Sequence, residues 1–147
     1  MAEQRTRFVG TFEHGLDDKG RMVLPARIRG QLGESGLLGK LDGCLGLWTI
    51  DGFFEMADRL QAEVDAGTGR VTGEAIRQFA AEAHEVSPDQ QGRIVVPARL
   101  RAYATLGSDV VVTGRIQRVE IWSAEAWAAR SAPSDAALTS AIQALGI

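Results

Sequence analysis

Short apolar runs, separated by turn-forming residues, recur along the chain and predict strands. They fall into two groups of four, because the order of runs in the first half is repeated in the second. The first group covers residues 9–17, 21–25, 37–41 and 44–50, and the second covers 83–89, 93–97, 109–114 and 118–122. Asp42-Gly43 lies between two of these runs and is a typical hairpin turn.

Apolar residues three and four positions apart predict helices between the strands. A helix with Asp51 as its N-cap carries one apolar stripe, made of Phe53, Met56, Ala57, Leu60 and Val64. A second helix is expected from about Thr72 to Ala83, after a linker at residues 65–69. Shorter helices are expected to begin at Pro25 and Pro97, since proline is favoured at the first helical position.

The chain contains an internal repeat. The stretch DDKGRMVLPARIR at residues 17–29 returns as DQQGRIVVPARLR at residues 89–101, an offset of 72. Farther along, LWTIDGF from Leu47 matches IWSAEAW from Ile121 at an offset of 74. The chain is therefore two diverged copies of one unit. We expect a first repeat at residues 1–69, a second at 70–130, and a weakly helical, loose tail at 131–147.

Each copy is too small to form a stable hydrophobic core alone. About four short strands and one or two helices bury too little apolar surface for a stable unit. We therefore expect an α+β fold in which the two copies pair their sheets, by pseudo-symmetry, into one shared β-core. Both copies would then present their first turns on the same side.

The first turn of each copy has the sequence Asp-x-x-Gly. Asp17 and Gly20 in the first copy, and Asp89 and Gly92 in the second, suit a tight turn. Aspartate can bond the backbone downstream of it, and glycine accepts a positive φ. We expect these four residues to be a scaffold that holds the turn and braces an arginine. The arginines placed in this way at the tips of hairpins are Arg21 and Arg93.

Positive charge is concentrated in these two stretches, although the chain as a whole is acidic. The 147 residues carry a net charge of −3. Residues 17–29 and 89–101 each carry +2, which leaves −7 on the rest of the chain. Such polarity can orient a polyanion such as DNA.

Catalysis and membrane insertion are not expected. His14 and His84 lack a serine or cysteine partner in a nucleophile motif, and neither a phosphate loop nor metal-ligand spacing is present, so no cofactor is expected. Cys44 is the one cysteine and is expected to be a buried small hydrophobe. No run approaches the roughly 20 apolar residues that cross a bilayer, which favours a cytoplasmic protein.

The paired motifs resemble those of the MraZ family. They are LDDKGRMVLPARIR and SPDQQGRIVVPARLR, separated by R-x-F-x-x-x-A-x-E at residues 77–85 and followed by RVEIW. The resemblance covers roughly residues 8–127. It implies an AbrB-like swapped-hairpin (double-split) β-barrel formed by two internal repeats, with packed helices.

The resemblance also implies a function. Members of this family are bacterial transcriptional regulators that bind repeated boxes in the promoter of the division and cell-wall gene cluster, usually including their own gene. They form homo-oligomeric rings of about eight subunits. We accordingly expect a protein that binds double-stranded DNA, associates with the nucleoid and is not an enzyme.

Arginines in the two motifs are the expected DNA contacts. Arg21 and Arg93 are assigned to the major groove, where a guanidinium fork can meet guanine O6 and N7, with Lys19 as support. Arg27 and Arg99 are further candidates for phosphate contacts. We expect Arg29 and Arg101 to form ion pairs instead, with acidic residues of an adjoining subunit.

Some features leave alternatives open. The second motif has Gln90-Gln91 where the first has Asp18-Lys19, so the second copy is expected to bind DNA more weakly. Arg5 and Arg7 belong either to a disordered extension or to the phosphate contacts. The alternative function is an antitoxin-like protein-interaction module of the same fold. Such proteins usually carry one copy and a disordered tail, so the duplication favours the regulator.

Overall fold

The computed structural model describes residues 6–147 as a mixed α+β fold with two antiparallel sheets. The strands are β1 Thr11–Gly15, β2 Arg21–Val23, β3 Gly36–Lys40, β4 Leu45–Thr49, β5 His84–Val86, β6 Arg93–Val95, β7 Asp109–Gly114 and β8 Val119–Ser123. The helices are α1 Ala26–Leu32, α2 Ile50–Asp65, α3 Gly73–Ala81, α4 Ala98–Tyr103, α5 Ala124–Ser131 and α6 Ser134–Leu145. Each run predicted as a strand overlaps one of these eight strands.

The two copies share their sheets strand by strand. The six-stranded sheet has the order β1-β7-β8-β4-β3-β5, and β2 pairs with β6 in a separate two-stranded ribbon. β1 of the first copy pairs with β7 of the second, and β5 of the second pairs with β3 of the first. This exchange obeys a pseudo-twofold relation and confirms the predicted shared β-core. Closure of the strands into a barrel stays a prediction.

The main core lies on one face of the six-stranded sheet and draws equally on both copies. Leu45 and Leu47 of β4 and Val119 and Ile121 of β8 point into it with no exposed surface. The ribbon and the short helices close this core with a matched set: Met22, Leu24 and Ile28 from the first copy and Ile94, Val96 and Leu100 from the second. The repeat is therefore a repeat of core positions as well as of charges.

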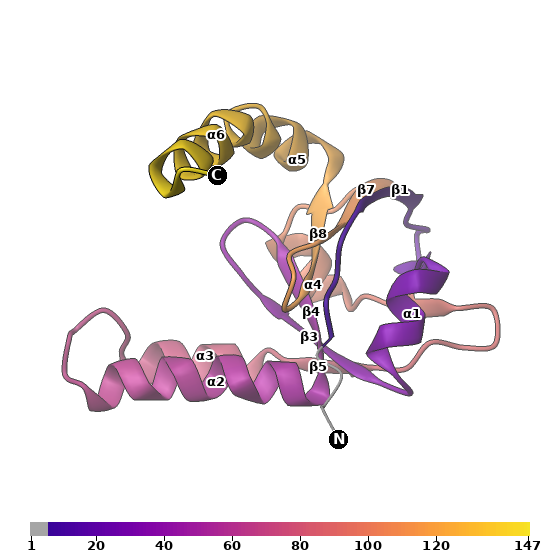
Figure 1. The fold of residues 1–147 in the computed structure, drawn as a ribbon. Coiled ribbons are helices and arrows are strands. Elements are labelled where there is room, and N and C mark those ends of the chain that lie inside the picture. The colour runs from indigo at the N-terminus through magenta and orange to yellow at the C-terminus, as the bar shows by residue number, and fades with distance from the viewer. Residues whose placement is uncertain (1–5) are drawn as a thin grey trace, which may run out of the picture.

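On the opposite face of the sheet, α5 covers β7 and β8. The β3 and β4 part of that face is covered by α2 and α3, which lie side by side and extend away from the strands (Figure 1). Here Trp48, Phe53 and Phe79 form an aromatic cluster, with Phe53 and Phe79 stacked at 4.7 Å between ring centroids. Most of the predicted stripe on α2 packs against this cluster. The stripe is thus used within the chain.

Three local predictions need correction. The N-cap of α2 is Thr49, whose hydroxyl accepts from Gly52 N at 3.0 Å, and not Asp51. α1 and α4 begin one residue after their prolines, because Pro25 and Pro97 have extended ψ values of 141° and 150°. The tail, expected to be weakly helical and loose, forms the twelve-residue helix α6.

Candidate nucleic-acid interface

The turn at Asp17 is organised by its carboxylate. Asp17 Oδ1 accepts the backbone N–H groups of Lys19 and Arg21 at 3.0 and 2.8 Å, and Asp17 Oδ2 accepts Arg21 Nε at 2.7 Å. The loop is closed by Asp17 N, which donates to Arg21 O at 3.1 Å. One aspartate therefore holds the turn and orients the arginine, as the sequence predicts.

The second copy repeats this geometry. Asp89 Oδ1 accepts the N–H groups of Gln91 and Arg93, each at 2.9 Å, and Asp89 Oδ2 accepts Arg93 Nε at 2.9 Å. The hydrogen bonds lower the pKa of Asp17 and of Asp89 below its usual value, and the largest cause is the backbone N–H of Arg21 or Arg93. Both carboxylates are therefore charged near neutral pH.

The two turns are not the tips of hairpins, because the strands that leave each turn enter different sheets. β1 continues along β7, with Leu16 N donating to Ser108 O at 2.8 Å, whereas β2 pairs with β6 of the other copy. Arg21 and Arg93 instead begin the two strands of the ribbon. Arg21 lies opposite Val95 and Arg93 lies opposite Val23.

The ribbon has one buried and one outward face. Met22 and Ile94 are buried, so the residues on either side of each point outward. The outward face carries both arginines, with Val23 and Val95 between them at 41% and 51% exposure. Strand spacing places the Cα atoms of Arg21 and Arg93 roughly 8 Å apart. Two cations, which are 72 residues apart in the sequence, thus share one small surface.

Gly20 and Gly92 allow this ribbon to form. Both have positive φ values, +81° and +79°, and their carbonyls accept from Val96 N at 2.7 Å and Leu24 N at 2.9 Å. A side chain on Gly20 would overlap the carbonyl oxygen of Val96. The turn glycine of one copy is therefore part of the strand pairing with the other copy.

Arg29 and Arg101 cross between the copies and pack on the opposite turns. Arg101 donates from Nε to Val96 O at 3.0 Å and from Nη1 to Asp18 O at 3.5 Å, and it lies against Gly20. Arg29 Nη1 donates to Gln91 O at 3.4 Å and lies against Gly92. Within residues 6–147 these guanidinium groups meet carbonyl oxygens and no carboxylate. Ion pairs with another subunit stay a prediction.

The remaining candidate cations differ in their surroundings. Lys19 and Arg27 are exposed, and no carboxylate in the described part of the chain pairs with either. Arg99, the counterpart of Arg27, has its Nε 2.6 Å from Oε2 of Glu82, although that oxygen makes no hydrogen bond. Glu82 was not singled out in the sequence, and the residue 72 positions before it is Gly10. The repeat offset could have revealed this difference.

Arg7 is exposed, and its backbone N–H donates to Gln31 Oε1 at 2.7 Å. Arg5 lies outside the described residues. Within residues 6–147, no helix has the length and apolar character needed to cross a bilayer.

A family model described as "MraZ protein, putative antitoxin-like" matches the chain twice, at residues 7–72 and 79–144. Together these segments include almost all of the described chain. The chain belongs to the MraZ family.

Curated MraZ relatives support the same assignment. "Transcriptional regulator MraZ" of Moorella thermoacetica is 42% identical over 122 residues, which cover 82% of this chain and 83% of the relative. The protein of the same name from Salinispora tropica is 40% identical over 87% of this chain and 89% of its own. That of Desulfitobacterium hafniense DCB-2 is 40% identical over 94% and 96%. These names are those of regulators and not of enzymes, which agrees with the sequence prediction.

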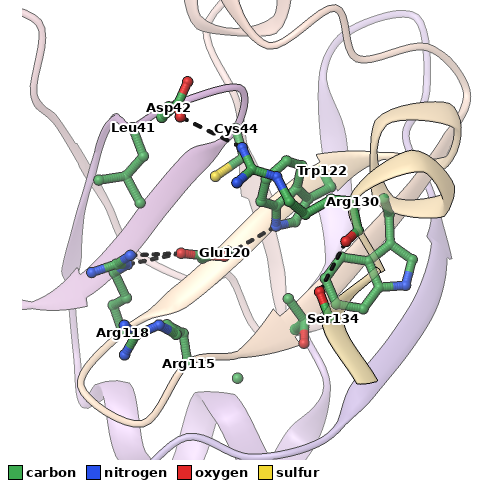
Figure 2. Close-up of a pocket in the computed structure, with 12 residues that line it drawn as sticks. Leu41, Asp42, Cys44, Arg115, Arg118, Glu120, Trp122, Arg130 and Ser134 are labelled. Atoms are coloured by element: carbon green, nitrogen blue, oxygen red, sulfur yellow. Dashed lines mark hydrogen bonds and ion pairs between the residues drawn. The ribbon is translucent and has the colours of Figure 1, made fainter. Parts of the chain in front are cut away.

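This MraZ chain also has a second group of arginines that the sequence analysis did not single out. Arg115, Arg118 and Arg130 line a half-open cavity of about 420 Å³ beside Trp122 (Figure 2). Arg118 donates twice to Glu120 Oε2, at 3.0 and 2.8 Å, and Glu120 Oε1 accepts from Trp122 Nε1 at 3.2 Å.

Arg130 in the same group stacks over the Trp122 ring, 5.3 Å from its centroid. Two of the three arginines are therefore engaged in contacts within the chain. We regard the outward face of the β2–β6 ribbon as the stronger candidate for a polyanion.

Proposed function

We propose that this chain regulates transcription by inserting the outward face of the β2–β6 ribbon into the major groove of duplex DNA. The observation that carries the proposal is the placement of Arg21 and Arg93 on one exposed face, each oriented by its own aspartate. A two-stranded antiparallel ribbon has the width to enter the major groove. The regulator names of the relatives support this choice over a role in catalysis.

The aspartates suit the arginines to base recognition. Each carboxylate accepts a hydrogen bond from Nε of its arginine, while Nη1 and Nη2 have no hydrogen-bond partner within residues 6–147. A guanidinium group held in one orientation loses less side-chain entropy when its fork meets guanine O6 and N7. Asp17 and Asp89 then act as positioning residues that do not themselves touch DNA.

The two halves of the ribbon are expected to contribute unequally. The first copy adds Lys19 and Arg27 beside Arg21. The second copy has Gln91 in place of the lysine, and Arg99 there is paired with Glu82. We therefore propose Lys19 and Arg27 as phosphate contacts and Arg99 as a weaker one. The second copy should bind more weakly, as its sequence indicates.

One ribbon offers few contacts, so useful affinity requires several subunits on successive DNA boxes. We propose a homo-oligomeric ring of about eight subunits that binds repeated boxes in the promoter of the division and cell-wall gene cluster, including the boxes before its own gene. Association with the nucleoid would follow from such binding. We also propose that the paired sheets form the swapped-hairpin barrel of AbrB-like proteins.

A gel shift with the DNA upstream of the protein's own gene tests the proposal. Wild type should bind this DNA in preference to a scrambled duplex, with an affinity that falls as salt rises. Each lost bidentate base contact costs about 1–3 kcal/mol, so Arg21→Ala/Arg93→Ala should bind at least roughly 30-fold more weakly.

A matched control is Arg59→Ala/Arg77→Ala, which removes the same charge from exposed positions on α2 and α3. It should bind as wild type does. Equal loss in both double variants would reduce the effect to net charge and contradict the assigned face. Absence of binding by wild type would leave the antitoxin-like protein-interaction module as the alternative.

A further inference from the structure

The C-terminal helix α6 has an apolar face without a partner. Leu138, Ile142 and Leu145 follow the spacing i, i+4, i+7 and are 59%, 38% and 73% exposed. Within the described chain α6 has no substantial contact except with α5. A helix of twelve residues is marginal in water without tertiary packing. α6 therefore needs another surface to hold it in place.

A groove of matching chemistry lies elsewhere on the same chain. It is lined by one turn of α2, with Met56 and Leu60, by one turn of α3, with Ala75 and Phe79, and by Tyr103 of α4. Its volume is about 380 Å³, and its lining is mostly apolar. Lys40 is the one charged residue in that lining, and Asp135 is the one charged residue of α6. The apolar face of α6 and this groove thus match in polarity.

The apolar face of α6 and the groove do not meet within one chain. In the view of Figure 1, α6 lies at the top and the α2–α3 pair at the lower left. Only Ala132 and Pro133 separate α6 from α5, which packs on β7 and β8, and within the described chain α6 makes no substantial contact with α2 or α3. A second copy of the chain supplies both surfaces without requiring any change in the fold.

We infer that α6 of one chain docks its Leu138–Leu145 face into the α2–α3 groove of a second copy, by the helix-in-groove mode. Because each groove wall is one helical turn, about 6 Å long, the groove accommodates two of the three side chains Leu138, Ile142 and Leu145. The contact is head-to-tail, because the apolar face of α6 on one chain meets the groove, a different surface, on the next chain. Head-to-tail contacts close into rings when the rotation between subunits permits. This inference rests on the proposed self-association and specifies its surface.

Substitutions on α6 test the contact through the molar mass of the intact protein, measured by light scattering. Leu138→Glu/Leu145→Glu should reduce the mass to that of a single chain. The matched control, Ser140→Glu/Gln143→Glu, adds the same charge to the opposite face of the same helix and should keep the wild-type mass. Circular dichroism should be unchanged in the control, and in Leu138→Glu/Leu145→Glu it should lose no more helix than α6 contributes, because the rest of the fold does not depend on α6.

The groove side has its own pair of variants. Ala75→Arg places a large cation at the groove wall and should lower the mass, whereas Ala80→Arg on the far side of α3 should not. A monomeric wild type would overturn the inference. A wild-type assembly that survives both Leu138→Glu/Leu145→Glu and Ala75→Arg would overturn it too, but would leave the proposed self-association and the DNA-binding ribbon standing.

Cross-linking separates contact between chains from contact within one. In a Cys44→Ala background, a Leu145→Cys chain is mixed with an Ala75→Cys chain and oxidised. A covalent mixed dimer is expected, because a disulfide needs Cβ atoms about 4 Å apart. Ser140→Cys in place of Leu145→Cys should give none. Equal cross-linking from Ser140→Cys would overturn the inference, as would a chain carrying both Leu145→Cys and Ala75→Cys that cross-links only to itself.

Discussion

Gly20 lies where the turn of one copy meets the strand of the other, so its replacement by alanine should destabilise the whole ribbon. Its φ of +81° costs an alanine about 1–2 kcal/mol. The added Cβ would also overlap Val96 O, a backbone atom that cannot move alone. Relief of the overlap would strain the bond from Val96 N to Gly20 O, worth about 0.5–1.5 kcal/mol. We expect Gly20→Ala to lower the unfolding free energy by about 2–3 kcal/mol.

The second copy provides an internal comparison. Gly92 has nearly the same φ, +79°, but its Cβ would meet the guanidinium of Arg29, the far end of a flexible side chain. Arg29 can swing away, so the cost of Gly92→Ala should approach the conformational part alone, about 1–2 kcal/mol. Gly30→Ala, on the exposed side of α1 with open space around it, should instead stabilise by about 0.5–1 kcal/mol.

Urea unfolding followed by tryptophan fluorescence measures these differences. All variants must be compared at one chain concentration, because self-association would couple stability to concentration. The expected order of stability is Gly30→Ala, wild type, Gly92→Ala and then Gly20→Ala. If Gly20→Ala were no less stable than Gly92→Ala, the overlap with a backbone carbonyl would not be the deciding factor, and the reasoning would fail.

Three further predictions concern other parts of the molecule. The folded-state pKa values of Asp17 and Asp89 lie below their usual 3.8, so these carboxylates stabilise the fold above pH 3.8 and lose that effect as the pH falls through the lowered values. In Asp17→Asn/Asp89→Asn the free energy of unfolding should therefore depend less on pH in the acid range than it does in wild type. Phe79→Ala removes one ring of the aromatic cluster and should cost about 3–5 kcal/mol in urea unfolding, whereas a loss below 1 kcal/mol would mean that α3 is not held by this ring. Burial raises the pKa of Cys44 to about 12, so native protein at pH 8 should react with iodoacetamide only as fast as it unfolds, and rapid labelling would contradict the buried position.

The repeat accounts for how much of the candidate site the sequence could predict. Asp17 and Arg21 are four residues apart, and a turn of that length brings them together whatever the rest of the chain does. The same holds for Asp89 and Arg93. Turn chemistry is local, so the predicted scaffold and braced arginines match the structure.

The choice of strand partners is not local, and there the sequence predicted that the copies share a sheet but not which strands pair. The alternation of Arg21, Met22 and Val23 fits pairing with β1 as well as with β6, since both place Met22 inward. The sequence therefore suggested a hairpin where the structure has a ribbon between copies. The sequence also did not indicate that Arg29 and Arg101 each donate to a carbonyl of the opposite copy's turn.

By itself, the sequence determined that this protein is a duplicated unit, where the strands and most helices of each unit lie, and which aspartate braces which arginine. These properties follow from periodicity, from the repeat offset and from hydrogen bonds that span a few residues. The sequence led us to expect both turns on one side, but only the tertiary structure decided that the two arginines lie on one face of a ribbon formed by β2 and β6. That depends on pairing between strands more than 70 residues apart, where several registers satisfy the same alternation and the choice is made by how the two copies close a single core.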